Sequence, residues 1–333
     1  MDLVTGGTGI VGAHLLLHLL EQGRYVRATH RPGSDRAVVR RIFEHYRPDG
    51  AALFDRIAWV EADLLDPTAL RTAMEGVSDV YHAAALVSFD PRDTKALFTH
   101  NIGGTANVVN AALEQGVGRL LHLSSTATIG KAAPGEAANE ESPWSRDRRT
   151  SAYAVSKYEA ELEVQRGIAE GLHAVLVNPC VIIGPGRTGR SSMTMIDRVR
   201  QGIRWVPPGS NGVVDARDVA AFSVALLNTG EVGGRHLLVG GNIGYGRLFT
   251  LICTAAGRPA PTRPLRPWML QVAWRLERLR TLFGGRPMIT RHTADTAVSE
   301  RRYDASKAER ITGMRFRTAE EMVANAVAFA QGR

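Results

Sequence analysis

Cysteine, acidic residues and long apolar runs are all scarce in this chain of 333 residues. Its two cysteines, Cys180 and Cys253, are too few for a disulfide framework or a cysteine-rich zinc site, and they suit a reducing compartment. No stretch approaches the roughly eighteen consecutive apolar residues of a transmembrane helix. We therefore expect a cytoplasmic protein with no metal site and no membrane-spanning segment.

Basic residues exceed acidic ones, and the formal net charge is +8. The excess gathers late in the chain, where residues 263–302 hold nine arginines against three acids. No motif that reads nucleic acid is interleaved with these arginines, so we expect no nucleic-acid partner. A solvated basic face explains the charge.

Apolar residues make up 44% of the chain, enough for a packed core. The length accommodates one large α/β domain and a smaller lobe.

A strand, a glycine-rich turn and a helix follow one another at the start of the chain. Residues 2–5 are short and β-prone, Gly6, Gly9 and Gly12 punctuate the turn, and residues 13–20 are typical of a helix. The first glycine permits the tight turn, the second lets backbone approach a pyrophosphate, and the third lets the helix pack closely. The pattern predicts a dinucleotide site that also involves Thr8 and Ile10 of the same turn.

The residues after the second strand favour NADP over NAD. Residues 25–29 alternate like a strand, and His30-Arg31-Pro32-Gly33-Ser34 follows without an acid. An acid at this place would bind the ribose 2′-hydroxyl of NAD, whereas Arg31 can pair with a 2′-phosphate and Ser34 can donate to it.

Tyr153 and Lys157 stand four residues apart in a helical stretch, so the phenol and the ammonium share one helix face. A nearby cation favours the phenolate, which predicts that Tyr153 exchanges a proton with a substrate oxygen. A hydroxyl cluster at 124–128 precedes the pair by about 27 residues, at the end of a buried strand.

The spacing Thr5-Gly6-x-x-Gly9-x-x-Gly12 resembles the short-chain dehydrogenase/reductase superfamily in its extended branch. Asn178-Pro179 and the arginine after the second strand look most like the dihydroflavonol-reductase and 3β-hydroxysteroid-dehydrogenase members. The resemblance implies that Thr126 holds the substrate oxygen with Ser125 near, and that Lys157 holds the nicotinamide ribose. It also implies further cofactor contacts, at Asp63, Leu64, Ala83, Ala84, Ala85, Asn178, Pro179 and Val181.

The implied fold is a doubly wound parallel sheet of the Rossmann type, in strand order 3-2-1-4-5-6 with place for a seventh. We expect residues 1–186 and 214–240 to form the dinucleotide-binding core, and 187–213 with 241–333 to form the substrate lobe. The resemblance also implies a homodimer through the helices that start near Gly103 and Tyr153.

The expected function is reduction of a ketone or aldehyde by NADPH, on a small apolar or aromatic substrate in a cleft walled by Phe89. A nucleotide-sugar epimerase of the same family is the alternative. A protein that binds NADP only as a sensor or scaffold is a third hypothesis, although such relatives tend to lose the tyrosine or the lysine, and both are present.

Four further residues or segments carry narrower expectations. His82 and Cys180 are expected in the core, and Asp218 is expected to cap a helix over 219–227. The helix over 265–283 has one apolar face, formed by Leu265, Met269, Val272, Leu276, Leu279 and Phe283. We expect this face to pack on the substrate lobe, and contact with a membrane surface or with an apolar substrate is the alternative.

Overall fold

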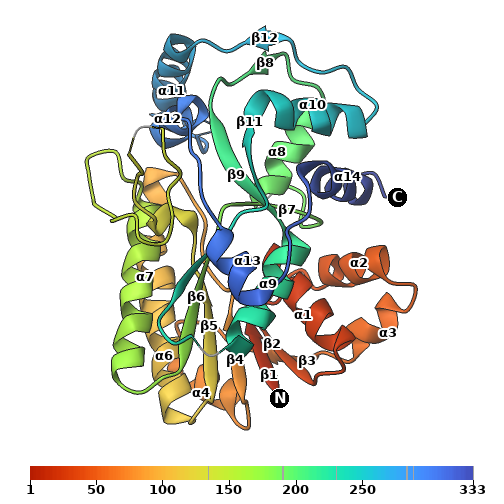
Figure 1. Ribbon diagram of the computed structural model, residues 1–333, viewed down its shortest axis with the longest axis vertical. Helices are drawn as coiled ribbons and strands as arrows, with labels where there is room; N and C mark the ends of the chain where they lie inside the picture. Colours follow the sequence, from red (N-terminus) through yellow and green to blue (C-terminus); the bar gives the residue numbers. More distant parts are fainter. Residues whose placement is uncertain (134, 190, 230, 283, 288, 333) are drawn as a thin grey trace.

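The computed structural model describes residues 1–333 except 134, 190, 230, 283, 288 and 333. At its centre lies a parallel sheet of seven strands in the order β10-β6-β5-β4-β1-β2-β3 (Figure 1). The strands are β1 (Asp2–Thr5), β2 (Val26–His30), β3 (Ala58–Glu61), β4 (Asp79–His82), β5 (Arg119–Leu123), β6 (Ala174–Pro179) and β10 (Arg235–Leu238). The predicted order is confirmed, and β10 takes the seventh place beside β6.

Helices cover both faces of this sheet, as expected for a parallel sheet. One face carries α1 (Ile10–Glu21), α2 (Ala37–Tyr46), α9 (Ala216–Thr229) and α13 (Ser306–Thr312), with α3 (Gly50–Asp55) beside them. The other carries α4 (Pro67–Met74), α6 (Gly104–Glu114) and α7 (Ala152–Ala169). Every residue of β1, β4 and β6 is buried, which places the core around the central strands.

A buried ion cluster closes the amino edge of the sheet. Arg24 pairs with Asp2 and with Asp79, each at 2.7 Å, and Arg119 reaches Asp79 at 2.6 Å. Burial nevertheless raises the pKa of the Asp2 carboxyl to about 6. The cluster joins β1, β4 and β5 at the end of the sheet opposite to the strand ends that ligands use in this architecture.

A smaller lobe stands over the carboxyl ends of the strands (Figure 1). Its sheet has the order β11-β9-β7, formed by β7 (Val181–Ile183), β9 (Ser210–Asp215) and β11 (Gly241–Gly244). The helices α8 (Ser191–Arg200), α10 (Tyr245–Ala255) and α14 (Ala319–Ala330) pack on this sheet through a separate apolar cluster. Since β7 belongs to the predicted core and β9 crosses residue 213, this sheet takes strands from both predicted parts. The division itself stays a prediction.

The outer end of the lobe carries a two-strand ribbon, β8 (Trp205–Val206) and β12 (Arg263–Pro264), with α11 (Pro267–Leu282) and α12 (Arg291–Val298). Short helical segments η1 (Pro91–Asp93), α5 (Thr94–Leu97) and η2 (Phe98–Gly103) lie between β4 and α6. No helix in the described part of the chain is long and apolar enough to span a membrane.

Two expectations about helices were wrong. Asp218 does not cap α9, because that helix already begins at Ala216. The Asp218 carboxylate instead accepts from the backbone N–H of Arg317 at 2.7 Å. The apolar face of α11 does not pack inward, since Val272, Leu276 and Leu279 are exposed. Phe283, the last member of that face, lies outside the described residues.

Candidate active site

The glycine turn forms a close-packed cradle between β1 and α1. Gly6 has φ of +69°, and a Cβ there would lie 2.7 Å from the Cα of Ala84. A Cβ on Gly12 would lie 2.2 Å from the carbonyl oxygen of Gly6, so only glycine allows α1 to start so near the turn. Among the described residues no side chain caps α1, and its first turn contains no acid. Free N–H groups and the helix dipole at this point fit an anionic diphosphate.

Arg31 and Ser34 follow β2 directly, in a turn at the carboxyl edge of the sheet. The Ser34 hydroxyl accepts from the backbone N–H of Arg31 at 3.1 Å, and Ser34 N–H donates back to the Arg31 carbonyl. The Arg31 side chain is exposed, so its guanidinium is accessible to a nucleotide phosphate at the end of β2.

The segments after β3 and β4 border the same edge. The Asp63 carboxylate accepts from the backbone N–H of Leu65 at 2.9 Å, and the Leu64 carbonyl accepts from Asn107 at 2.9 Å. Ala84 N–H donates to the Thr5 hydroxyl at 3.3 Å, which ties the segment of Ala83, Ala84 and Ala85 to the glycine turn. These contacts fix the backbone on which the predicted cofactor contacts depend.

Tyr153 lies in the first turn of α7, where Ser151 caps the helix. The Ser125 side chain lies near enough to the Tyr153 phenol to favour its ionised form. Burial raises the pKa of the Tyr153 phenol, and the Ser125 side chain offsets part of that rise. The phenol therefore keeps its proton near neutral pH, which suits a proton donor.

Ser125, rather than Thr126, is the member of the hydroxyl cluster that reaches the phenol. Ser125 also accepts from the backbone N–H of Ala127 at 3.2 Å, and Thr126 begins the short helical turn η3 (Thr126–Thr128). Thr126 is 8% exposed and buried in that turn. Which of these two hydroxyl groups holds the substrate oxygen stays a prediction: the sequence predicted Thr126 with Ser125 near it, and of the two it is Ser125 whose side chain acts on the phenol.

Lys157 is buried one helical turn beyond Tyr153, and its ammonium faces β5. It donates to the carbonyl oxygen of Leu123 at 2.7 Å and lies 3.4 Å from Nε2 of His122. Burial lowers the pKa of Lys157 to about 8, and the Glu161 carboxylate opposes that change. The ammonium is turned toward Leu123, and the expected effect of Lys157 on the pKa of the Tyr153 phenol stays a prediction.

His82 and His122 fill the space beneath the ammonium, with ring centroids 5.2 Å apart. The His82 ring bonds to the Thr5 hydroxyl at 2.7 Å and to the Thr105 hydroxyl at 3.1 Å. Burial and the nearby ammonium lower the pKa of His82 to about 3, so this ring stays neutral. His82 is therefore a core histidine, as the sequence predicted.

Glu161 is a site residue that the sequence interpretation missed. It lies one turn after Lys157, is 1% exposed, and accepts from the hydroxyls of Ser124 and Thr128, the second at 2.7 Å. Asn178 also donates to it at 2.7 Å, and Arg235 pairs with it at 2.7 Å. One carboxylate thus joins the ends of β5, β6 and β10 to α7. A glutamate at this helical spacing from the lysine was the signal available in the sequence.

The Asn178 side chain is part of this hydrogen-bond network and is fully buried. It also donates to the hydroxyl of Thr128 at 3.0 Å. Pro179 ends β6, Val181 begins β7, and the Cys180 thiol between them has its pKa raised by burial. A cofactor contact from this segment would therefore come from its backbone and not from the Asn178 amide.

Phe89 contacts the phenol of Tyr153 and also lines a cavity. Its ring meets Tyr153 edge-on at 5.5 Å and stacks on His292 of α12 at 4.8 Å. The cavity has a volume of about 250 Å³ and lies between three chain segments, residues 88–94, 148–152 and 290–295. Since Phe89 lines this cavity and touches Tyr153, the cavity is the candidate substrate side of the site.

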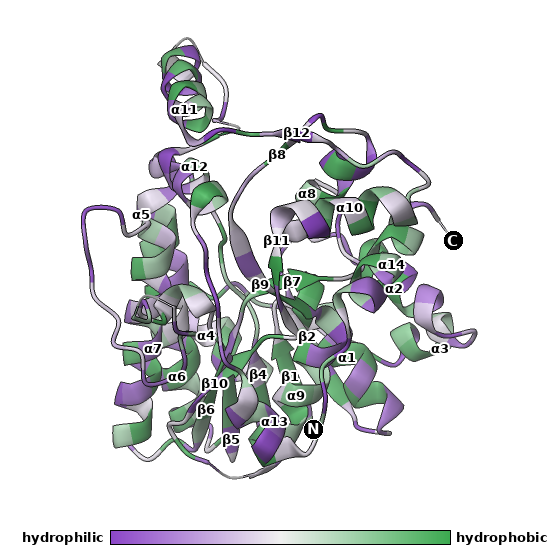
Figure 2. Cartoon of the chain, turned by 45° about the horizontal axis from the view of Figure 1, so that its top comes forward, coloured by the Kyte–Doolittle hydropathy of each residue, from purple (hydrophilic) through white to green (hydrophobic). Residues whose placement is uncertain are grey.

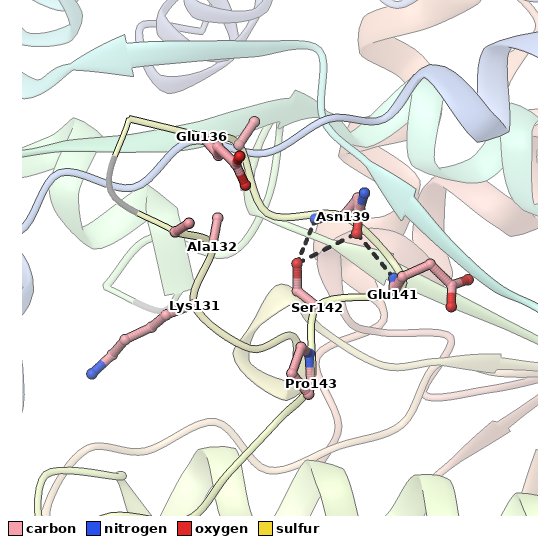
Figure 3. Close-up of a pocket in the computed structure, with 9 residues that line it drawn as sticks. Lys131, Ala132, Glu136, Asn139, Glu141, Ser142 and Pro143 are labelled. Atoms are coloured by element: carbon pink, nitrogen blue, oxygen red, sulfur yellow. Dashed lines mark hydrogen bonds between the residues drawn. The ribbon is translucent and has the colours of Figure 1, made fainter.

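A second hollow of about 260 Å³ lies within the loop after η3 (Figure 3). Asn139 and Ser142 shape it, as the Ser142 hydroxyl accepts from Asn139 N–H at 3.0 Å. This loop is fixed to the lobe, because Ala138 N–H donates to the Arg302 carbonyl at 2.9 Å. Its lining contains none of the predicted site residues, so we assign it no part in the chemistry.

Family comparison decides between the dinucleotide-binding families that share such a sheet. A family model described as the NAD dependent epimerase/dehydratase family matches residues 3–240. The chain belongs to this family. Its relatives and its fold identify it as an NAD(P)-dependent oxidoreductase of the extended short-chain dehydrogenase/reductase type, which confirms the resemblance seen in the sequence.

Two relatives match over nearly their whole length. A putative dihydroflavonol 4-reductase from Synechocystis sp. is 34% identical over 97% of this chain and 92% of its own. Sterol demethylase protein B from Methylococcus capsulatus is 32% identical over 99% of this chain and 98% of its own. The crystal structure of a dTDP-glucose 4,6-dehydratase from Streptomyces venezuelae, with NAD and TYD bound, superposes with a TM-score of 0.75. It is 19% identical, covers 100% of this chain and 97% of its own, and shows the shared fold.

Proposed function

We propose that this family member is an NADPH-dependent reductase that interconverts a ketone or aldehyde and an alcohol on an apolar or aromatic skeleton. The observation that carries this proposal is the position of the Tyr153 phenol, beside the Ser125 side chain and against Phe89 of the adjoining cavity. The relatives named for a dihydroflavonol and a sterol support a ring skeleton as substrate.

In this mechanism the protein positions the substrate and the cofactor, and it supplies the proton. When bound, a nicotinamide dinucleotide would supply the hydride, with its diphosphate on the turn from Gly6 to Gly12. Ser125 donates a hydrogen bond to the substrate oxygen. Tyr153 gives its proton to the same oxygen as negative charge develops there. Lys157 would hold the nicotinamide ribose through its ammonium.

The exposed guanidinium of Arg31 supports NADPH as the preferred cofactor. It follows β2 where an acid would favour the 2′-hydroxyl of NAD, and a guanidinium binds a phosphate in a forked geometry. Ser34 of the same turn adds a hydroxyl beside it.

A nucleotide-sugar epimerase remains the second candidate, because the solved structures that share the fold include such enzymes. A UDP-glucose 4-epimerase from Bifidobacterium longum superposes with a TM-score of 0.76 at 18% identity, which shows the fold alone. The reductase assignment has the stronger support, because the relative that is 34% identical over 97% of this chain is named as a putative dihydroflavonol 4-reductase.

A substrate screen separates the two. The purified protein is mixed with flavonoid and steroid ketones, short aldehydes or UDP-sugars, each with NADPH or NADH, and the nicotinamide absorbance is followed. We expect oxidation of NADPH with the ring ketones. Conversion of UDP-sugars without net cofactor oxidation would support the epimerase instead.

A further inference from the structure

Four apolar side chains of α11 face solvent in a single stripe. Trp268, Val272, Leu276 and Leu279 are 61%, 46%, 61% and 56% exposed. Their spacing of four, four and three residues places them on one side of the helix. Leu270, on another side, is 7% exposed and supplies the inward contact. The stripe is therefore the outer face of α11.

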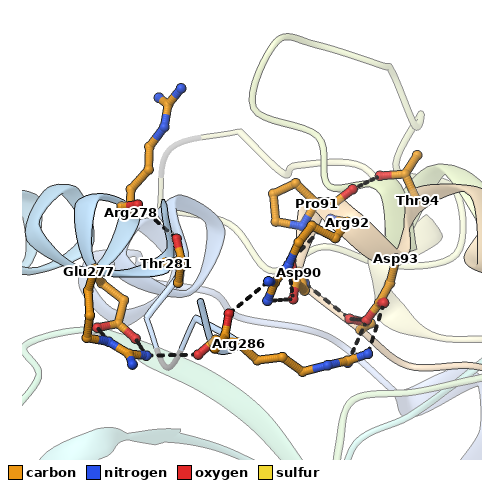
Figure 4. Close-up of polar contacts among 12 residues, drawn as sticks. Asp90, Pro91, Arg92, Asp93, Thr94, Glu277, Arg278, Thr281 and Arg286 are labelled. Atoms are coloured by element: carbon orange, nitrogen blue, oxygen red, sulfur yellow. Dashed lines mark hydrogen bonds and ion pairs between the residues drawn. The ribbon is translucent and has the colours of Figure 1, made fainter. Parts of the chain in front are cut away.

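Polar contacts join α11 and the segment that follows it to α12 and to the loop after β4. Figure 2 shows α11 standing beyond the body of the lobe, next to α12. Gln271 donates to Asp295 of α12 at 3.2 Å, and after the helix Arg286 pairs with Asp93 at 3.1 Å. Arg92 donates to the carbonyl of Gly285 at 2.8 Å, so the end of α11 is tied to the loop after β4 (Figure 4).

Positive charge surrounds the stripe. Residues 263–291 contain seven arginines, and Glu277 is their one acid. Arg275 and Arg278 are exposed and flank the stripe on one side, while Arg280 lies on the other and pairs with Glu277 at 2.7 Å. An apolar face with a tryptophan and with arginines along its borders is the pattern of a helix that lies in a membrane interface.

We propose that α11 docks this protein on the surface of an anionic phospholipid membrane. The four apolar side chains would enter the acyl boundary, and the flanking arginines would meet lipid phosphates. A second copy of the chain suits the face less, since a twofold contact would bring Arg275 and Arg278 against the same residues of the other copy.

The candidate substrate cavity is lined in part by α12, the neighbour of α11. His292 of α12 stacks on Phe89, and Phe89 touches Tyr153. An apolar substrate could then pass from the bilayer to the phenol over a short path. Membrane binding itself does not depend on the proposed reaction.

Vesicle co-sedimentation of the full chain tests the proposal without any turnover. We expect binding to phosphatidylglycerol-containing vesicles and much weaker binding to pure phosphatidylcholine vesicles. The double variant Leu276→Ser/Leu279→Ser should lose binding by at least about tenfold, because it removes two apolar anchors. Each of Arg275→Gln and Arg278→Gln should weaken binding to the anionic vesicles by roughly fivefold.

Two variants elsewhere serve as matched controls. Val232→Ser changes a valine that is 47% exposed, as Val272 is 46% exposed, and Arg310→Gln changes an exposed arginine of α13. Both should bind vesicles like the parent, and thermal melting checks that every variant is folded. The proposal fails if the parent ignores anionic vesicles, or if the α11 variants bind as the parent does. It also fails if light scattering shows a dimer that Leu276→Ser/Leu279→Ser dissociates, because a second copy would then cover the stripe.

Discussion

Lys157 and Glu161 lie one turn apart on α7, and each is 1% exposed. The ammonium points to the Leu123 carbonyl, and the carboxylate gathers Ser124, Thr128 and Asn178. The pair therefore links the buried ammonium of Lys157 to the hydroxyl groups of Ser124 and Thr128. Because a buried ammonium needs a nearby opposite charge, Glu161 has an electrostatic as well as a structural role.

Glu161→Gln should shift the pH profile of turnover. Without the carboxylate the pKa of Lys157 falls further below its present value of about 8, so the alkaline limb of activity moves to lower pH. The variant should also lose about 3 kcal/mol of stability, since Arg235 and the buried hydroxyls lose their charged partner. Turnover against pH and denaturation by urea measure the two effects.

Glu163→Gln is the matched control on the same helix. Its carboxylate pairs with Arg166 at 3.0 Å on the partly exposed side, so the loss should stay under about 1 kcal/mol. Equal pH profiles for Glu161→Gln and the parent would leave the carboxylate with a purely structural role.

Folding stability should rise with pH because of Lys157. The folded protein releases this proton near pH 8, whereas the unfolded chain keeps it to about pH 10. In that window the unfolded state binds more protons, so raising the pH favours the folded state. Urea midpoints of the parent should increase between about pH 7.5 and 9.5 relative to those of Lys157→Met, which has no such proton. Parallel midpoints for the two proteins would show that the ammonium is not destabilised by burial.

Arg31→Glu should reverse the cofactor preference. A carboxylate at the end of β2 repels a 2′-phosphate and accepts from a 2′-hydroxyl, so the ratio of kcat/KM with NADPH to that with NADH should fall by about a hundredfold or more. Arg36→Glu is the control, since this arginine lies 5.8 Å from the Trp59 ring centroid and not in the turn itself. A parent enzyme that oxidises NADH but not NADPH would refute the role of Arg31.

Much of the core could be predicted from the sequence because its signals are local. The glycine spacing and the apolar runs predicted strands of the core, and the family resemblance implied their order in the sheet. Segments without such a signal were missed. The strand β7 was not predicted, since a run of three apolar residues is too short to show a period, and its pairing with β9 joins segments distant in the sequence.

The candidate site was predicted in outline, and its details depend on contacts between distant segments. Tyr153 and Lys157 follow from helical spacing, but the nearness of Ser125 to the Tyr153 phenol depends on how α7 packs against the turn η3 after β5. Glu161 acquires its partners from β6 and β10, far away in the sequence. The sequence could not show that the apolar face of α11 is exposed, because exposed and buried apolar faces of a helix have the same spacing of residues.

The central claim is that the phenol of Tyr153 gives its proton to a substrate oxygen held by Ser125, and Tyr153→Phe tests it most directly. This variant keeps the ring against Phe89 and removes only the hydroxyl. On a carbonyl substrate found in the screen with NADPH, we predict that kcat falls by at least about a hundredfold, while NADPH binding, followed by fluorescence titration, stays unchanged. Full activity in Tyr153→Phe would contradict the account.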